Sequence, residues 1–529
     1  MKTFKSYFAG REKIIYLTIL FLFSISVNQY YGNLGICPID SFWFFNSGYD
    51  ILNGYYPFKD YWTITGPFIG FTQAIIFKLL GVSWSSYVFH ASIYNFLISI
   101  FTFHTLRKFK LNIHHSFIYA FLVAIIAYPS AGTPYVDHHA SILSVISLFC
   151  FILALKTNDK IYWILLPIIL FLAFITKQVP SAYILILIIF LLLIYFMFNF
   201  SINKIIYILS GSAIIILFFL LTLFIGKISF LSFIEQYIFF TMSIGEDRFS
   251  NFLFPFEFSR FFLRHKLIHI SSIILFIIII KNTLQNPKFI KNIDFLILLS
   301  FLVFSYSFIA HQLMTINGMF IFFIIPILTA FSHIYYLKYF SPKKYVINFL
   351  SLLAIISTFY YGYKYIDKRD FMDLRNADKN NYVDAGIVDK KLNGLKWISC
   401  LHPDNPQEEI SELKQVIQII KNDERKKSII TDYQFISVIL SSYDFSPNQV
   451  WFINNALYKK SEIKIFKKYK DFFVNHFKNN KIQVVYTIKP LWGGDDIFEK
   501  ALDSDCYTKN NITKILDVYQ IEQCKAFEN

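Results

Sequence analysis

Ionisable side chains recur at the ends of hydrophobic runs in the first two thirds of the chain. Asp40 follows the first run, and Asp137 opens a later one in the sequence Asp137-His138-His139. One interpretation is that both aspartates are helix N-caps, a position at which aspartate is preferred. The other is that a carboxylate at an interfacial cleft accepts a proton as a general base. We therefore take Asp40 and Asp137 as the candidate catalytic residues.

The two histidines after Asp137 raise the question of a metal ion. His138 and His139 would lie about 100° apart on a helix, so they cannot easily bind one ion together. A divalent metal would need Asp137, His138 and a group from another loop, such as Asp40. Metal dependence is therefore left open, and no other cofactor is expected.

Further polar residues on the same side of the hydrophobic runs are candidates for substrate binding. Lys177-Gln178 lies between two runs, and His311 closes another. A lysine in such a place either extends to the lipid headgroups or contacts an anion, and a compact ammonium is a common partner for phosphate. The candidate binding residues are Tyr56, Lys59, Asp60, His138, Lys177, Gln178, Arg248 and His311.

The composition places these residues in a membrane protein. The chain has 529 residues, of which 55% are hydrophobic and 16% charged, whereas about a quarter of the residues are charged in soluble domains. Residues 1–364 carry 25 Lys+Arg against 11 Asp+Glu, and residues 365–529 carry 25 against 24. The positive excess thus lies in the hydrophobic part, where bases orient helices, so nucleic acid is not an expected partner.

Hydrophobic runs of about 20 residues predict membrane-spanning helices. A shorter run, 67–81, is interpreted as a helix lying on the outer surface, because counting it as a span would place Arg107 and Lys108 outside. The resulting topology leaves sixteen bases and three acids on the cytoplasmic side, as the positive-inside rule favours. The eleven predicted spans are 14–31, 84–106, 116–131, 137–155, 161–176, 180–198, 203–226, 266–281, 293–311, 314–337 and 346–364.

The predicted architecture is a polytopic α-helical domain, 1–364, followed by a soluble α/β domain, 365–529. The positive-inside rule places the N-terminus in the cytoplasm, and an odd number of spans then places the C-terminal domain on the other side of the membrane. The second domain is then periplasmic or extracellular, at a plasma membrane or bacterial inner membrane. An oxidising compartment permits a disulfide between Cys506 and Cys524, which leaves Cys400 free or bonded to one of these two instead.

The order of these features resembles that of GT-C-type integral-membrane glycosyltransferases. Asp40, Gly54-Tyr-Tyr-Pro57, Gly66-Pro67 and Phe77-Lys-Leu-Leu-Gly81 resemble the first external loop of these enzymes. The most similar branch is the protein O-mannosyltransferase and lipid A aminoarabinose transferase group. Asp137, Ala173-Phe-Ile-Thr-Lys177 and the stretch from His311 to Pro326 fall where these families have similar patterns.

The resemblance implies a reaction as well as a fold. Such enzymes transfer a sugar from a polyprenyl-phosphate donor at the outer face of the membrane, to a lipid, glycan or protein. Asp40 matches the acidic residue of the first external loop and would be the general base. Lys177 and Arg248 would stabilise the phosphate leaving group. The expected partners are membrane lipids and the lipid-linked donor, and the acceptor is unknown.

Two other function classes are consistent with a polytopic protein of this kind. One is a transporter or flippase of lipid-linked sugars, and the other is a non-catalytic subunit of envelope assembly. Transporters usually place ionisable groups at the middle of the bilayer and often contain internal repeats. The acids of this chain gather at one predicted surface and no repeat is evident, so the sequence favours the enzyme.

Overall fold

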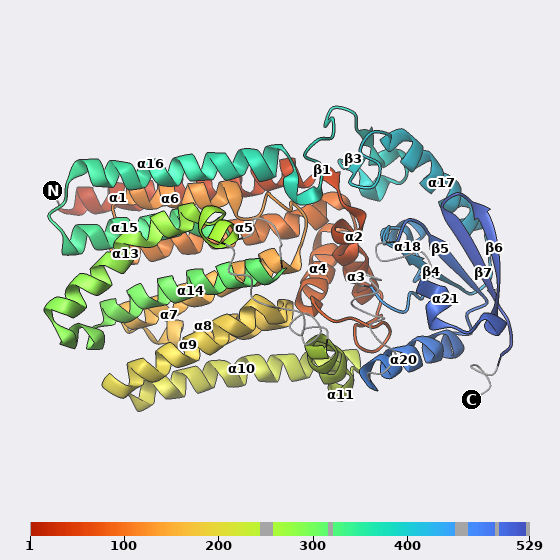
Figure 1. The fold of residues 1–529 in the computed structure, drawn as a ribbon, viewed down its shortest axis with the longest axis horizontal. Helices are drawn as coiled ribbons and strands as arrows, with labels where there is room; N and C mark the ends of the chain where they lie inside the picture. The colour runs from red at the N-terminus through yellow and green to blue at the C-terminus, as the bar shows by residue number, and fades with distance from the viewer. Residues whose placement is uncertain (1, 244–257, 316–320, 450–463, 492–496, 525–529) are drawn as a thin grey trace. The chain divides into compact units, whose positions relative to one another are not determined.

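The computed structural model describes residues 2–243, 258–315, 321–449, 464–491 and 497–524 (Figure 1). The chain forms two compact units, each built from three separate segments. Unit 1 comprises Met1–Gly32, Val88–Phe218 and Phe256–Arg375, and unit 2 comprises Asn33–Tyr87, Phe219–Pro255 and Asn376–Asn529. The predicted boundary at residues 364 and 365 differs from this division, because two earlier segments group with the C-terminal domain and unit 1 extends to Arg375.

Unit 1 is a helical bundle. Eight of the described helices are long and apolar enough to cross a bilayer, so the chain is a multi-pass membrane protein; α6 and α8 are apolar but shorter. The full set of eleven spans stays a prediction, although each predicted run overlaps one of the described helices. These helices are α1 (Lys2–Gly32), α5 (Trp84–Lys108), α6 (Ile113–Ile126), α7 (Val136–Thr157), α8 (Lys160–Thr176), α9 (Gln178–Phe198), α10 (Ile202–Gly226), α13 (Lys266–Gln285), α14 (Ile293–Thr315), α15 (Ile324–Tyr339) and α16 (Lys344–Tyr361).

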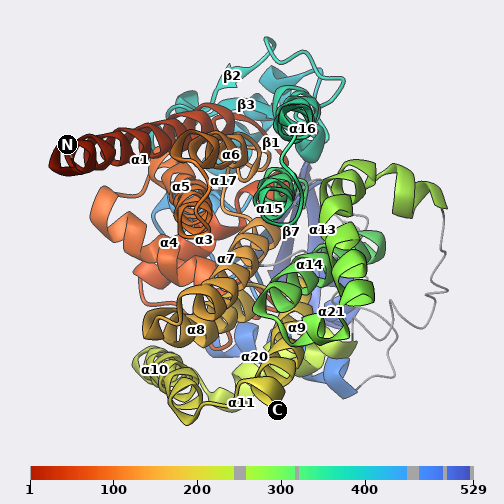
Figure 2. The same ribbon diagram turned by 90° about the vertical axis from the view of Figure 1, so that its left-hand side faces the viewer.

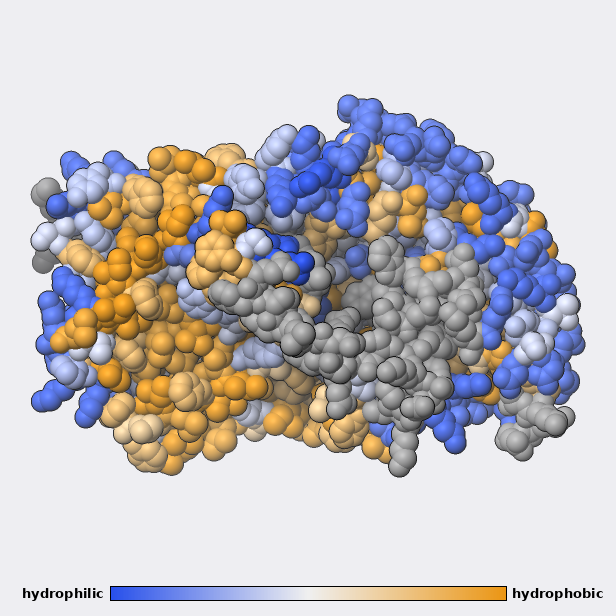
Figure 3. All heavy atoms as spheres, viewed as in Figure 1, coloured by the Kyte–Doolittle hydropathy of each residue, from blue (hydrophilic) through white to orange (hydrophobic). Residues whose placement is uncertain are grey.

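The centre of the bundle is α7. In the most apolar 18-residue stretch of α7, 89% of the residues are buried, compared with 17% in the corresponding stretch of α10. Figure 2 shows α7 surrounded by other helices, among them α8, α9 and α14, with which it packs. The helices at the edge of the bundle carry exposed apolar side chains such as Leu217 and Phe224, and hydrophobic residues cover much of the bundle face drawn in Figure 3. Lipid contact explains this surface, since water would disfavour so large an apolar area.

Unit 2 begins with a short strand and three helices. These are β1 (Leu34–Ile36), α2 (Pro38–Ser41), α3 (Trp43–Leu52) and α4 (Pro67–Leu80). Helices α3 and α4 approach closely at two glycines, since a Cβ at Gly48 would lie 2.5 Å from Cγ of Gln73 and one at Gly70 would lie 2.7 Å from Oγ of Ser47. The prediction that the run 67–81 forms a helix is confirmed by α4. Its placement on the membrane surface stays a prediction.

Two small sheets complete unit 2. The first has the order β1-β3-β2, with β1 parallel to β3 (Lys396–Ser399) and antiparallel pairing of β3 with β2 (Val383–Asp384). The second has the order β4-β5-β7-β6. Its strands are β4 (Lys427–Thr431), β5 (Val484–Ile488), β6 (Tyr507–Thr513) and β7 (Leu516–Ile521), and the helices α17 (Pro406–Asn422), α18 (Ile436–Leu440) and α20 (Lys464–Asn480) accompany them.

Both disulfides of the described residues lie in unit 2. Of the pairings that the sequence left open, the structure contains the bond between Cys506 and Cys524. The expectation for Cys400 is wrong, because this residue bonds Cys37. Pairing of β1 with β3 is the reason: the backbone N–H of Cys400 donates to the carbonyl of Ile36 (3.1 Å), which brings the two cysteines to a Cα–Cα distance of 5.1 Å.

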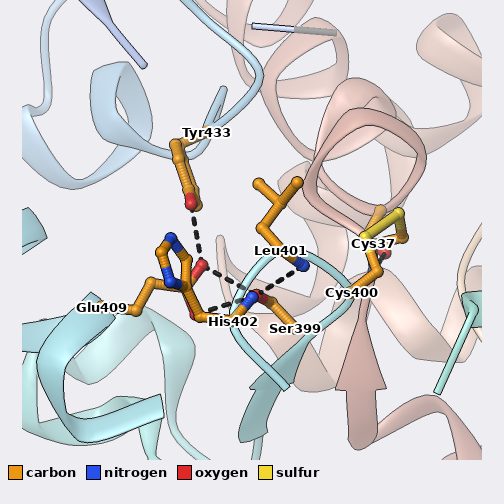
Figure 4. Close-up of a disulfide and its surroundings, with 8 residues drawn as sticks. Cys37, Ser399, Cys400, Leu401, His402, Glu409 and Tyr433 are labelled. Atoms are coloured by element: carbon orange, nitrogen blue, oxygen red, sulfur yellow. Dashed lines mark hydrogen bonds between the residues drawn. A yellow bond between two sulfur atoms is a disulfide. The ribbon is translucent and has the colours of Figure 1, made fainter. Parts of the chain in front are cut away.

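A buried glutamate ties this disulfide to the rest of the domain (Figure 4). Glu409 of α17 is 2% exposed. Its carboxylate accepts hydrogen bonds from Nε1 of Trp397 (2.7 Å), Oγ of Ser399 (2.8 Å) and the hydroxyl of Tyr433 (2.7 Å). Oγ of Ser399 in turn accepts from the backbone N–H of His402 (3.1 Å). Every polar group in this cluster has a partner, which is the pattern of a structural network.

Candidate functional site

The first turn of α7 holds the acid of the candidate site. Asp137 is fully buried, and the N-cap of its helix is Tyr135, which makes no side-chain cap hydrogen bond. The N-cap interpretation of Asp137 is therefore wrong, because the carboxylate faces away from the free backbone N–H groups toward neighbouring helices. A buried carboxylate requires a compensating partner.

That partner is Lys177, which joins α8 to α9. Its backbone is extended (φ −155°, ψ 133°), so the chain turns between the two helices at this residue. Nζ of Lys177 donates to Oδ1 of Asp137 at 2.6 Å, and its side chain is 17% exposed. The side chain thus reaches into the bundle and not to the headgroups, which excludes the interpretation of Lys177 as a residue that only extends to the lipid surface.

A third helix brings His311 to the same carboxylate. Nε2 of His311, in the last turns of α14, lies 3.6 Å from Oδ1 of Asp137, and the side chain is 1% exposed. Tyr183 of α9 packs its ring edge-on against the imidazole at 6.4 Å between centroids. Three of the residues predicted from the sequence, Asp137, Lys177 and His311, therefore form one acid–base cluster, which we call the α7 cluster.

The α7 cluster keeps unused hydrogen-bonding capacity. Among the described residues, Oδ2 of Asp137 is buried without a hydrogen-bond partner. Lys177 has two further N–H groups after donating to Asp137. A buried ion pair often stabilises a fold no more than apolar residues of the same volume would. An incompletely satisfied pair is therefore a candidate binding site for a polar ligand.

The two histidines that follow Asp137 face elsewhere. Nε2 of His138 interacts with Oγ of Ser130 at 2.8 Å. His139 is hydrogen-bonded to the hydroxyl of Tyr128, and its Nε2 lies 3.3 Å from Nε2 of His90. Within the described ranges no group of three histidine, cysteine or acidic residues could hold a metal ion. The metal set of Asp40, Asp137 and His138 stays a prediction, since Asp40 belongs to unit 2 and the other two residues to unit 1.

Arg369 is a residue of this region that the sequence did not suggest. It is fully buried, and Nη1 donates to the backbone carbonyls of Pro129 (3.2 Å) and Ser130 (3.1 Å). Arg369 thereby fixes the corner before α7, from which Ser130 contacts His138. No local pattern identifies it, since it lies in a charged stretch more than 200 residues after that corner.

Asp40, the other candidate acid, belongs to unit 2. It is the third residue of α2, whose N-cap is Cys37, so its interpretation as an N-cap is wrong as well. The side chain is half-buried. The helix dipole favours a negative charge in the first turn, so Asp40 can stabilise α2.

The remaining candidates are placed as follows. Lys59 and Asp60 form an ion pair (3.4 Å), and Oδ2 of Asp60 also accepts from the backbone N–H of Tyr56 (2.7 Å), so these three residues form one turn of unit 2. Gln178 is half-buried at the start of α9. Arg248 lies outside the described residues.

Two buried acids in unit 2 were not predicted. Asp50 of α3 is 0% exposed and accepts a hydrogen bond from Nε2 of Gln449, and Asp444 is 4% exposed. Burial raises the pKa of Asp50 well above its ordinary value. Burial also raises the pKa of Asp444 to about 7, although the backbone N–H of Ser446 opposes the shift. Each acid follows a tyrosine in a stretch whose pattern is typical of a turn or an amphipathic helix. The local sequence therefore did not indicate that these acids are buried.

Comparison with known proteins adds no assignment. No protein-family model matches the chain, and no curated protein matches it significantly.

Proposed function

We propose that this protein transfers a sugar from a polyprenyl-phosphate donor to an acceptor at the outer face of the membrane. The α7 cluster is the observation that carries the proposal. It combines a buried carboxylate, a lysine and a histidine at the ends of three apolar helices, with one carboxylate oxygen unpartnered among the described residues. Ionisable groups inside a membrane bundle are costly, and they usually mark a functional site.

The outer-face orientation rests on charge and on the disulfides. The predicted topology collects most bases of the helical part on the cytoplasmic side. Unit 2 carries Cys37–Cys400 and Cys506–Cys524, and such bonds persist in oxidising compartments. Both observations favour a unit 2 that lies outside the cytoplasm, with eleven spans between the cytoplasmic N-terminus and the C-terminal domain.

The proposed reaction is a single displacement at the anomeric carbon. The acceptor oxygen forms a bond to this carbon while the bond to the phosphate oxygen breaks, and the electron pair leaves with the polyprenyl phosphate. Lys177 donates to the phosphate oxygens as their charge grows, and Asp137 holds the lysine in place. The resemblance assigns to Asp40 the role of the general base that accepts the proton of the acceptor, a contribution of about 10²–10⁴ in rate.

Two substitutions separate these roles. We expect Asp40→Asn to lower kcat by about 100-fold or more, since it removes the base at nearly constant side-chain size. Lys177→Ala should mainly raise the KM for the donor, because a phosphate contact acts partly in the ground state. The measurement follows a labelled polyprenyl-phosphate sugar in membranes that contain the full-length protein, with the label counted in the lipid and non-lipid fractions.

Matched controls lie elsewhere on the same helices. Asp159 caps α8 by accepting from the N–H of Ile161 (3.1 Å), and asparagine caps equally well, so Asp159→Asn should leave transfer unchanged. Lys156→Ala removes an exposed lysine from the opposite end of α7. Near-full transfer by Asp40→Asn would refute the base, and movement of an intact lipid-linked sugar across the bilayer would favour a flippase.

A further inference from the structure

Unit 2 contains a polar cleft outside the α7 cluster. It is formed by the turn around Tyr55 and Lys59, the segment around Tyr443 and the C-terminal half of α20, and its volume is about 240 Å³. Pockets for drug-sized ligands span roughly 300–1,000 Å³. The cleft is therefore suited to one ring-sized group.

Aromatic rings form one wall of the cleft. Tyr55 and Tyr443 stack in parallel, with centroids 3.8 Å apart and an interplanar angle of 7°. The hydroxyl of Tyr443 donates to the backbone carbonyl of Asp60 (3.0 Å), which holds the pair in place. Phe472 of α20 adds a third ring to the lining. Rigid aromatic surfaces of this kind bind apolar faces of a ligand at low entropic cost.

Amide side chains also line the cleft. Asn475 and Asn479 are one helical turn apart on α20, so both face the cleft. Both are exposed, and within the described part of the chain neither amide has a hydrogen-bond partner. Each amide offers donors and an acceptor, as recognition of vicinal hydroxyl groups requires.

The charges of the cleft cancel. Its charged side chains, Lys59 and Asp60, pair with each other at 3.4 Å. His476 interacts through Nε2 with the backbone carbonyl of Phe445 (2.9 Å), and burial lowers the pKa of this histidine, which keeps it neutral. A phosphate would find no uncompensated cation here, whereas phosphate sites usually present arginine or lysine.

We propose that this cleft binds one neutral sugar unit of a glycan. Aromatic rings together with amides in the lining match a pyranose, which has apolar C–H faces and an equatorial rim of hydroxyl groups. The inference goes beyond the proposed transfer, because sugar binding here requires no reaction. If transfer also occurs, the bound unit belongs either to the acceptor or to the lipid-linked donor.

The test uses the full-length protein in nanodiscs and ligand-observed NMR. The probes are the methyl α- and β-pyranosides of glucose, galactose, mannose and N-acetylglucosamine, with inorganic phosphate as the anionic competitor. We expect at least one glycoside to bind the wild type and Asn475→Ala/Asn479→Ala to bind it at least tenfold more weakly. Alanine favours a helix more than asparagine does, so the double variant should fold.

Gln415→Ala is the matched control, since it removes an exposed amide from α17, outside the cleft. It should bind as the wild type does. Binding of no glycoside, unchanged affinity in the double variant, or displacement of the glycoside by phosphate would each overturn the proposal.

The outcomes also separate this proposal from the proposed transfer. Glycoside binding without transfer would mean that the enzyme proposal fails alone, and transfer without glycoside binding would mean that the cleft proposal fails alone. Where both succeed, a raised KM of the cleft variant for the acceptor assigns the sugar to the acceptor. A raised KM for the lipid-linked substrate assigns it to the donor.

Discussion

Two buried carboxylates, one in each unit, have opposite surroundings. In unit 2, Glu409 accepts hydrogen bonds from Trp397, Ser399 and Tyr433 and uses both of its oxygens. In unit 1, Asp137 has Lys177 and His311 at one oxygen, while the other oxygen has no partner among the described residues. A satisfied network specifies structure, whereas a partly satisfied one needs another explanation. The comparison supports a structural role for Glu409 and is consistent with the chemical role that we propose for Asp137.

The largest effect on stability is expected at Glu409. Glu409→Ala leaves three buried donors without an acceptor, and each costs about 1–3 kcal/mol. We expect a loss of at least about 3 kcal/mol in the unfolding free energy of unit 2, with transfer per folded molecule unchanged. Denaturant unfolding of the intact protein in micelles, followed by tryptophan fluorescence, measures the first quantity.

The control for this prediction is the neighbouring residue. Glu408 is exposed, with only a long contact to Lys514 (3.7 Å), so Glu408→Ala should cost less than about 1 kcal/mol. Equal stability of the two variants would remove the structural role assigned to Glu409.

A smaller effect is expected from Asp444, a buried acid with few hydrogen bonds. Its pKa is raised from 3.8 to about 7 in the folded protein. A raised pKa means that the folded state holds the proton more tightly than the unfolded state does, so its stabilising contribution is complete below about pH 4 and is lost as the pH rises to about 7.

Asp444→Asn should flatten the decline of stability over this interval, because asparagine keeps an acceptor for the N–H of Ser446 and does not ionise. The check is the melting temperature of unit 2 at pH 5 and pH 7.5, with the exposed Asp404→Asn as control. A pH slope that is unchanged in Asp444→Asn would contradict the assignment, and a residual slope is expected from Asp50.

Much of the fold could be predicted from local patterns, because an apolar run of this length can satisfy its backbone in a membrane only as a helix. The pairing of β1 with β3 could not be predicted, since it joins Leu34 to Lys396 across the whole helical part. The disulfide between Cys37 and Cys400 depends on that pairing, so the expectation for Cys400 failed.

For the candidate site, too, the sequence indicated individual residues but not how they come together. Asp137, Lys177 and His311 each stood out as a polar residue at the end of an apolar run, but their convergence depends on how α7, α9 and α14 pack. Glu409 follows Glu408 in the first turn of an amphipathic helix, where acids are ordinary, so its burial was not evident. Asp50 and Asp444 were missed for the same reason: burial is a property of the packed domain.

The central claim is that the Asp137–Lys177 pair serves chemistry and not stability. The most direct test replaces both charges at once, by Asp137→Asn with Lys177→Met, since exchanging a buried ion pair for neutral residues is often nearly neutral for folding. We predict a melting temperature close to that of the wild type, and a loss of about 100-fold or more in kcat/KM for the donor, because the phosphate loses its contact in both the ground state and the transition state. A double variant that transfers sugar at nearly the wild-type rate would contradict the account.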